Sequence, residues 1–194
     1  MNMRAPLFTL LPRPKPTGLA GRHVLILGLG DTGLSVAHWI AQAGGRVRVA
    51  DTRATPPCAA ELAAAVPQAD LRCGAFDRSL LDAVDLLCLS PGLSLAEPVV
   101  QAAIERGLPV VGDIELFAWQ LRAAPGAKVI GVTGTNGKTT VTALVGHLLR
   151  CAGVDCEVAG NIGPAVLAAL LARTRAGSAP ALWVLELSSY QLET

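Results

Sequence analysis

Aromatic and charged residues are scarce in this sequence, and their scarcity limits the kinds of protein it can be. Aromatic residues make up 4% and charged residues 16% of the 194 residues, whereas hydrophobic residues make up 52%. Mostly small and aliphatic residues supply this hydrophobic share, as expected of helices that pack closely on parallel strands. The formal net charge is only +1, so the composition gives no reason to expect a nucleic-acid or membrane partner.

Cysteines and long apolar runs are also lacking. The five cysteines are odd in number and have no paired spacing, which argues against a disulfide framework. No Cys/His cluster has the spacing of zinc ligands. The opening segment contains four prolines but no apolar run long enough for a signal peptide or a membrane span. We therefore expect residues 1–17 to form a flexible tail and the protein to work in the cytoplasm.

Short apolar runs alternate with amphipathic segments from Arg22 onward, which is typical of α/β proteins with a parallel sheet covered on both faces. The pattern predicts a Rossmann-like domain over residues 18–112. Its expected strands are His23–Gly28, Arg46–Asp51, Asp70–Gly74, Asp85–Ser90 and Pro109–Gly112. Its expected helices are Gly33–Gly44, Ala59–Val66, Arg78–Val84 and Glu97–Arg106.

A second α/β unit is expected over residues 113–194, as the first part of a P-loop ATPase-type domain. It opens with a connecting helix at Ile114–Leu121, where Asp113 and Glu115 are interpreted as cap and surface groups. Lys128–Thr133 and Leu182–Leu187 are expected strands. The helix expected at Thr139–Cys151 has an apolar face, which should be its buried face, formed by Val141, Leu144, Val145 and Leu148.

A glycine turn at Gly28–Gly33 fits the pattern G-x-G-x-x-G between a strand and a helix. Such a turn brings backbone N–H groups and a helix N-terminus to a pyrophosphate. Asp51 ends the next strand, where a ribose-binding acid is expected. The ligand stays open at this point: it is a nicotinamide dinucleotide, or a uracil and its ribose held by Asp51, Thr52 and Arg53. Gly92 follows a later strand at the same sheet edge.

A second glycine-rich loop, Gly131–Thr140, also connects a strand to a helix. It departs from the usual G-x-x-x-x-G-K-[ST] pattern, because residue 132 is valine where the pattern has its first glycine. Its glycines let backbone N–H groups turn toward phosphate oxygens, Lys138 supplies a cation, and the Thr139 hydroxyl is a candidate Mg²⁺ ligand. The predicted ATP-binding residues are Gly134, Thr135, Asn136, Gly137, Lys138, Thr139 and Thr140.

Glu186 interrupts an apolar strand and is the second candidate Mg²⁺ ligand. A buried lone carboxylate is costly unless it is paired or metal-bound. The alternative is a solvent-facing glutamate at the edge of the sheet. Asn161, in the turn Gly160–Gly163, is a candidate for contact with phosphate or substrate.

The loop GVTGTNGKTT at Gly131–Thr140 resembles the ATP loop of the Mur ligases and their folylpolyglutamate synthase relatives. Further runs resemble the D-glutamate-adding branch of the Mur ligase family. They are GLGDTGLS at Gly28–Ser35, DTRATPP at Asp51–Pro57, GDIELF at Gly112–Phe117, GNIG at Gly160–Gly163 and ELSSYQLE at Glu186–Glu193.

This resemblance implies ATP, Mg²⁺, D-glutamate and UDP-N-acetylmuramoyl-L-alanine as ligands, and an acyl phosphate as intermediate. It implies a catalytic role for Lys138 and Glu186, with Mg²⁺ on Thr139 and Glu186, and requires no nucleophile from Ser188 or Ser189. The UDP-substrate residues that it implies are Gly28, Leu29, Thr32, Asp51, Thr52, Arg53, Gly92 and Asn161.

We expect a monomer. The resemblance also implies a C-terminal amino-acid-binding domain that this sequence does not contain, so we expect the 194 residues to be inactive alone. Two other functions remain open. One is a sibling ligase that adds L-alanine to the sugar, which Glu186–Glu193 disfavours. The other is an NAD-dependent dehydrogenase or nucleotide sensor, which the second glycine-rich loop disfavours.

Overall fold

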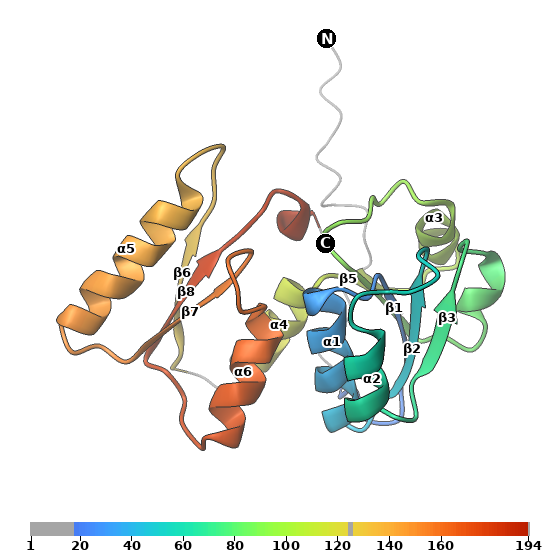
Figure 1. The fold of residues 1–194 in the computed structure, drawn as a ribbon, viewed down its shortest axis with the longest axis horizontal. Helices are drawn as coiled ribbons and strands as arrows, with labels where there is room; N and C mark the ends of the chain where they lie inside the picture. Colours follow the sequence, from blue (N-terminus) through green and yellow to red (C-terminus); the bar gives the residue numbers. More distant parts are fainter. Residues whose placement is uncertain (1–17, 124–125, 194) are drawn as a thin grey trace, which may run out of the picture. The chain divides into compact units, whose positions relative to one another are not determined.

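The computed structural model describes residues 18–123 and 126–193. Its contacts divide the chain after Gly112 into two compact units, and the second unit runs from Asp113 to Leu192 (Figure 1). The tail predicted over residues 1–17 lies outside the described residues. Both units are α/β with parallel sheets, which confirms the predicted fold class.

The first unit contains a five-stranded sheet in the order β3-β2-β1-β4-β5, with every pair parallel. Its strands are β1 His23–Leu27, β2 Arg46–Asp51, β3 Asp70–Cys73, β4 Leu86–Leu89 and β5 Val110–Val111. Its helices are α1 Asp31–Gln42, α2 Ala59–Ala65, α3 Pro98–Glu105 and the 3₁₀ turn η2 Arg78–Leu81. The strand order reverses between β1 and β4, and ligands of such sheets bind at this switch point.

The strands β1 and β4 are buried on both faces, which explains their unbroken apolar sequences. Leu25 and Leu27 belong to the same core cluster as the residues of α3 and η2. Because right-handed crossovers lead in opposite directions from β1 and β4, α1 and α3 cover opposite faces of the sheet. The prediction of a helix over Arg78–Val84 was wrong in length. Only the 3₁₀ turn Arg78–Leu81 forms, and Ala83 after it has a φ of 58°, which a helix does not allow.

The second unit contains a three-stranded parallel sheet in the order β6-β8-β7. Its elements are α4 Asp113–Ala123, β6 Lys128–Val132, α5 Lys138–Cys151, β7 Cys156–Gly160, α6 Val166–Arg175, β8 Leu182–Glu186 and the 3₁₀ turn η3 Tyr190–Leu192. Phe117 of α4 packs edge-to-face on Trp183 of β8, with ring centroids 4.9 Å apart. Because β8 lies between β6 and β7, it is the central strand. Its side chains are covered from α4, through Phe117, and from α5.

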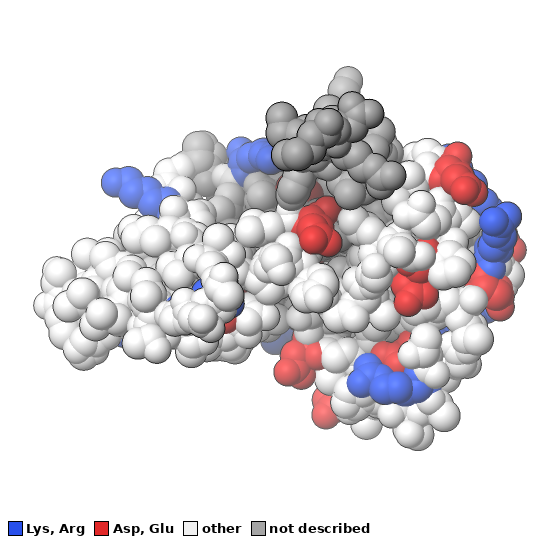
Figure 2. All heavy atoms as spheres, turned by 90° about the horizontal axis from the view of Figure 1, so that it is seen from above, with Lys and Arg blue, Asp and Glu red and all other residues white. Residues whose placement is uncertain are grey.

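The buried face of α5 differs from the predicted one. Val141, Leu144 and Leu148 are 47%, 52% and 58% exposed, whereas Thr142 and Gly146 are buried. A Cβ atom at Gly146 would lie 2.4 Å from Cγ2 of Val158, so the helix approaches β7 most closely at this glycine. The apolar residues lie on the opposite side of α5, and the α5 end of Figure 2, at the left, is mostly free of charged side chains.

Among the described residues, no helix is long and apolar enough to cross a membrane. The same part of the chain contains no group of three or more His, Cys, Asp or Glu side chains arranged to hold a metal ion.

Candidate functional site

The glycine turn after β1 owes its shape to glycines with different roles. Gly28 has a φ of 90°, which side chains rarely permit, and a Cβ atom at Gly33 would lie 2.0 Å from the Gly28 carbonyl oxygen. Helix α1 can therefore pack against the turn only with glycine at residue 33. A Cβ atom at Gly30, by contrast, would have nothing within 4 Å. The N-terminus of α1 thus lies beside open space, as a pyrophosphate site requires.

Asp51 organises this turn from the end of β2, where it is only 2% exposed. Its Oδ2 accepts a hydrogen bond from the Leu29 N–H at 2.7 Å, and its Oδ1 accepts one from the Arg53 N–H at 2.9 Å. The Arg53 guanidinium also donates to both oxygens, at 2.8 and 2.6 Å. These bonds, led by those of the Arg53 side chain, hold the pKa of the Asp51 carboxyl well below its usual value.

Four donors occupy Asp51, and a carboxylate offers about four lone-pair sites. A ribose hydroxyl would therefore need to displace one of these donors. The Arg53 side chain is the one free to move, because it is 53% exposed. Leu29 is fully buried and its N–H is bonded to Asp51, so its side chain is closed to a ligand.

The remaining first-unit residues predicted for the UDP-substrate lie at the same carboxyl edge of the sheet. Thr32 is half-buried in the first turn of α1, and its carbonyl accepts a hydrogen bond from Ser35. Thr52 and Gly92 are exposed just after β2 and β4. Ser90 donates to the Gly28 carbonyl at 3.1 Å and so ties the end of β4 to the glycine turn. One edge of one sheet therefore carries these residues, whereas Asn161 belongs to the second unit.

The loop between β6 and α5 contains two glycines with positive φ, Gly134 at 146° and Gly137 at 76°. Gly137 is the N-cap of α5, where a left-handed backbone favours glycine. The Lys138 ammonium donates to the Gly134 carbonyl at 2.8 Å and so lies over the loop. The predicted residues Thr135, Asn136, Thr139 and Thr140 are all exposed. A helix N-terminus, exposed hydroxyls and one cation thus gather in a single loop.

Glu186 stands at the carboxyl end of β8, beside the start of this loop. It is the register partner of Val132, the last residue of β6, and is only 2% exposed. The solvent-facing alternative is therefore wrong, because β8 is the central strand. Asn161 donates to Glu186 twice, from Nδ2 to Oε1 at 2.7 Å and from its backbone N–H to the Glu186 carbonyl at 2.8 Å.

Whether a cation fits here depends on the surroundings of the second carboxylate oxygen of Glu186. Oε2 is buried and has no hydrogen-bond partner among the described residues. A buried carboxylate oxygen is costly to leave unpaired, and hard cations such as Mg²⁺ prefer oxygen ligands. The residues beside the loop Gly131–Thr140, which we call the phosphate loop, therefore fit a magnesium ion, with Glu186 and the exposed Thr139 hydroxyl as the available oxygens.

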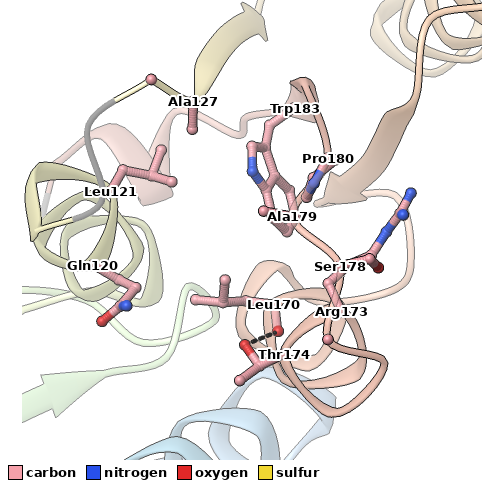
Figure 3. A pocket seen from close by; sticks show the side chains of 12 residues that line it. Gln120, Leu121, Ala127, Leu170, Arg173, Thr174, Ser178, Ala179, Pro180 and Trp183 are labelled. Carbon is pink, nitrogen blue, oxygen red and sulfur yellow. Dashed lines mark hydrogen bonds between the residues drawn. The ribbon is translucent and has the colours of Figure 1, made fainter.

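A hollow of about 530 Å³ lies elsewhere in the second unit, between α4 and α6 (Figure 3). Trp183 and Ala127 place it at the amino ends of β8 and β6, whereas the phosphate loop follows their carboxyl ends. Arg173 on its rim is paired with Asp155 and Glu157. The hollow includes none of the predicted site residues, so it is separate from the phosphate loop.

Two structural features at the end of β8 were missed by reasoning from the sequence. Asp113, which was interpreted as a cap or surface group, is 2% exposed and contacts Gln191. Ser188 and Gln191 form a capping box, in which each side chain bonds the backbone N–H of the other residue. The spacing S-x-x-Q in Ser188–Gln191 was a signal for this box, but nothing in the sequence links it to Asp113.

Two family models match the chain. The model described as "Mur ligase MurD-like, N-terminal domain" matches residues 22–112, and the Mur ligase middle domain matches residues 132–194. Of solved structures, UDP-N-acetylmuramate:L-alanyl-gamma-D-glutamyl-meso-diaminopimelate ligase from Neisseria meningitides is 26% identical. Its TM-score is 0.54, over 86% of this chain and 52% of that chain.

Curated relatives are more similar in sequence. The UDP-N-acetylmuramoylalanine--D-glutamate ligase of Nitrosospira multiformis is 54% identical over 91% of this chain, and that of Thiobacillus denitrificans is 51% identical over 91%. The matched part is 38% and 40% of these relatives, so the chain spans less than half of their length. The family resemblance of the sequence motifs is therefore confirmed, and the chain belongs to the Mur ligase family, with a MurD-like N-terminal domain followed by middle-domain sequence.

Proposed function

We propose that the protein containing this sequence is an ATP-dependent ligase that adds D-glutamate to UDP-N-acetylmuramoyl-L-alanine in peptidoglycan precursor synthesis. The observation that carries the proposal is the phosphate loop with Glu186 beside it, in a chain that is 54% identical to a ligase of this name. No described side chain is needed as a nucleophile, because such chemistry requires positioning and charge neutralisation.

In this proposal the second unit activates the substrate. The alanyl carboxylate oxygen attacks the terminal phosphorus of ATP, and ADP leaves. The D-glutamate amine then attacks the acyl carbon, inorganic phosphate leaves, and the amine loses a proton as the amide forms. Residues 134–140 hold the ATP phosphates, with Lys138 as the cation that neutralises the charge developing on the transferred group. Magnesium, held by Thr139 and Glu186, would supply further positive charge there.

The first unit would hold the UDP part of the substrate at the edge formed by the turn and β2. The backbone of Gly28–Gly30 and the helix N-terminus suit the pyrophosphate. Arg53 is exposed enough to rearrange, and its movement would free Asp51 for the nucleoside. Thr32, Thr52 and Gly92 complete this edge. Asn161, which also holds Glu186, is proposed to contact the substrate from the second unit.

The cellular setting belongs to the same proposal. Precursor synthesis with ATP takes place in the cytoplasm, and we propose a monomer that has neither a nucleic-acid nor a membrane partner. The described residues carry charges of both signs interspersed over the face shown in Figure 2. On this face, Lys and Arg therefore do not form the single basic patch that is typical of a polyanion site.

The decisive experiment measures phosphate release by the intact protein with ATP and Mg²⁺. Release should require both UDP-N-acetylmuramoyl-L-alanine and D-glutamate. Turnover of UDP-N-acetylmuramate with L-alanine instead would support the sibling ligase. Tight NAD binding without any amino-acid-dependent phosphate release would support a dehydrogenase or sensor and overturn the proposal.

A further inference from the structure

Asp113 is a buried carboxylate to which the proposed reaction assigns no role. It begins α4, is 2% exposed, and accepts hydrogen bonds from Nε2 of Gln191 at 3.4 and 3.3 Å. Burial raises the pKa of its carboxyl group above the ordinary value, and the hydrogen bonds from Gln191 and from the backbone N–H groups at the start of α4 only partly oppose this shift. Seventy-eight residues separate Asp113 from Gln191, so the contact joins two elements that are distant in sequence.

The carboxylate dictates which way the Gln191 amide points. An ionised carboxylate only accepts hydrogen bonds, so the amide nitrogen of Gln191 must face Asp113 and its oxygen must face away. That oxygen, Oε1, accepts from the Ser188 N–H at 3.1 Å and from the Ser188 hydroxyl at 3.3 Å. The Ser188 hydroxyl in turn accepts from the Gln191 N–H at 3.2 Å. The proton of Ser188 is therefore committed to Gln191, and one lone pair of its oxygen remains.

Ser188 follows β8 at the end where this strand pairs with the start of the loop Gly131–Thr140. The Leu187 N–H donates to the Val132 carbonyl at 2.9 Å, so strand pairing continues beyond Glu186. Side chains alternate along a strand, which places Ser188 on the same side as Glu186. Ser188 is half-buried and therefore remains accessible. A group at this place that can only accept suits a donor near the cation, such as a water molecule on hydrated magnesium.

We propose that Asp113 is a positioning residue for the ATP site: through Gln191 it orients Ser188 as a hydrogen-bond acceptor for a magnesium-bound water. Asp113 itself touches no ligand. The inference rests on the proposed function only as far as residues 134–140 bind Mg²⁺ and ATP. It does not depend on which amino acid or which sugar nucleotide the ligase joins.

Reversing the polarity of the contact tests the proposal in the intact protein. Asp113→Asn keeps the shape but sets one amide N–H₂ group against another, so Gln191 loses its fixed orientation. Gln191→Glu sets two carboxylates against each other. The double variant Asp113→Asn/Gln191→Glu restores a donor opposite an acceptor and keeps the capping box, which accepts Glu as well as Gln. Glu115→Gln is the control, because Glu115 lies in the same first turn but its side-chain bonds among the described residues go to Trp119 and Arg122 and not to Gln191.

Calorimetric titration with Mg²⁺ and a non-hydrolysable ATP analogue is the main measurement. Asp113→Asn and Gln191→Glu should each weaken binding about fivefold, the size of one lost hydrogen bond. The double variant should recover to within about twofold of the parent, and Glu115→Gln should match the parent. Ser188→Ala should show the same loss as Asp113→Asn, and adding Asp113→Asn to it should cause no further loss. The KM for the sugar nucleotide should stay unchanged in all variants.

Two results would overturn the proposal: unchanged affinity in Ser188→Ala, or a double variant that binds as weakly as Asp113→Asn does. The Ser188→Ala measurement remains a test even if Asp113→Asn fails to fold. Ser188 is only half-buried, so we expect Ser188→Ala to fold. A parent protein that binds Mg²⁺ and the ATP analogue but does not join D-glutamate would contradict the proposed function alone. The binding comparison among the variants would then still decide the role of Asp113.

Discussion

At the scale of single residues, Asp51 is the side chain whose surroundings most restrict its role. Its carboxylate accepts from Leu29 and Arg53, and these bonds depress its pKa. A depressed pKa in the folded state means that the ionised form contributes stability above the unfolded-state pKa, about 3.9. This contribution is lost as the pH falls through the lower folded-state pKa. Asp51 should therefore stabilise the turn throughout the neutral range.

The substitution Asp51→Asn tests this dependence. We expect it to lower the melting temperature of the intact protein, because removing an acceptor from a buried N–H group costs about 1–3 kcal/mol. The difference from the parent should be constant between about pH 8 and pH 5, and should shrink only below the ordinary aspartate pKa of about 3.9. Thr52→Ala, at the exposed neighbouring residue, is the control and should leave the melting temperature unchanged. A difference that already declines between pH 8 and pH 5 would contradict this account.

Lys138 and Thr139 give a second prediction at this scale. Lys138→Ala removes the cation that lies over the loop, and Thr139→Ala removes the proposed magnesium ligand. Each should lower kcat of the intact ligase about 10²-fold or more, by analogy with other lost contacts to developing charge. Both variants should fold, because Thr139 is exposed and the only described hydrogen bond of the Lys138 side chain is to the loop. Near-normal turnover of either variant, measured by phosphate release, would show that its residue has no such role.

At the scale of elements, two glycines of the same turn should respond differently to alanine. A Cβ atom at residue 33 would lie 2.0 Å from the Gly28 carbonyl oxygen, and backbone cannot yield as a flexible side chain can. Gly33→Ala should therefore displace α1 and lower the melting temperature strongly. Gly30→Ala meets no atom within 4 Å, so the protein should fold normally.

The same pair separates folding from binding. Gly30 caps α1 at the open end of the turn, so a methyl group there should hinder close approach of a pyrophosphate. Calorimetry should show weaker UDP binding by Gly30→Ala at an unchanged melting temperature. If UDP binding by this variant equals that of the parent, the pyrophosphate does not lie against Gly30.

The elements that were predicted correctly are those whose signals are local. The strands His23–Leu27 and Lys128–Val132 are apolar runs followed by glycine turns, and both turns lead into helices as expected. Strand β7 was missed, because Cys156–Gly160 mixes a charged residue with small ones. The predicted buried face of α5 was wrong, because periodicity identifies an apolar stripe but not which side of the helix packs against the sheet. In this chain the close approach at Gly146 places that stripe outside.

Contacts between distant residues were beyond the reach of the sequence. The burial of Glu186 follows from β8 lying between β6 and β7, a strand order that the linear pattern does not contain. The same holds for Asp113 and Gln191, which meet across 78 residues. The apolar run around Glu186 already made it a candidate metal ligand, but its bond to Asn161 and its unpaired oxygen are results of the fold.

At the scale of the whole molecule, each unit has a glycine turn that leads into a helix N-terminus, so we expect two independent nucleotide sites. The Asp51 and Arg53 pair lies in the first unit, and Lys138 and Glu186 lie in the second. Calorimetry should therefore find that UDP and ATP bind without competing. Lys138→Ala should weaken ATP binding and leave UDP binding unchanged, whereas Arg53→Ala should do the reverse.

The identity of the first ligand decides between a ligase and a dehydrogenase. Asp51 has all four acceptor sites filled, so the paired ribose hydroxyls of NAD would meet no free carboxylate unless Arg53 moved. A uracil offers Arg53 its carbonyl oxygens to bind once the side chain has moved, and this exchange offsets part of the lost ion pair. UDP should therefore bind the parent more tightly than NAD does. Arg53→Ala should reduce this difference in affinity, because it weakens the binding of UDP. Tighter binding of NAD than of UDP, in calorimetry at the same ionic strength, would contradict the assignment of the first unit to a UDP-sugar.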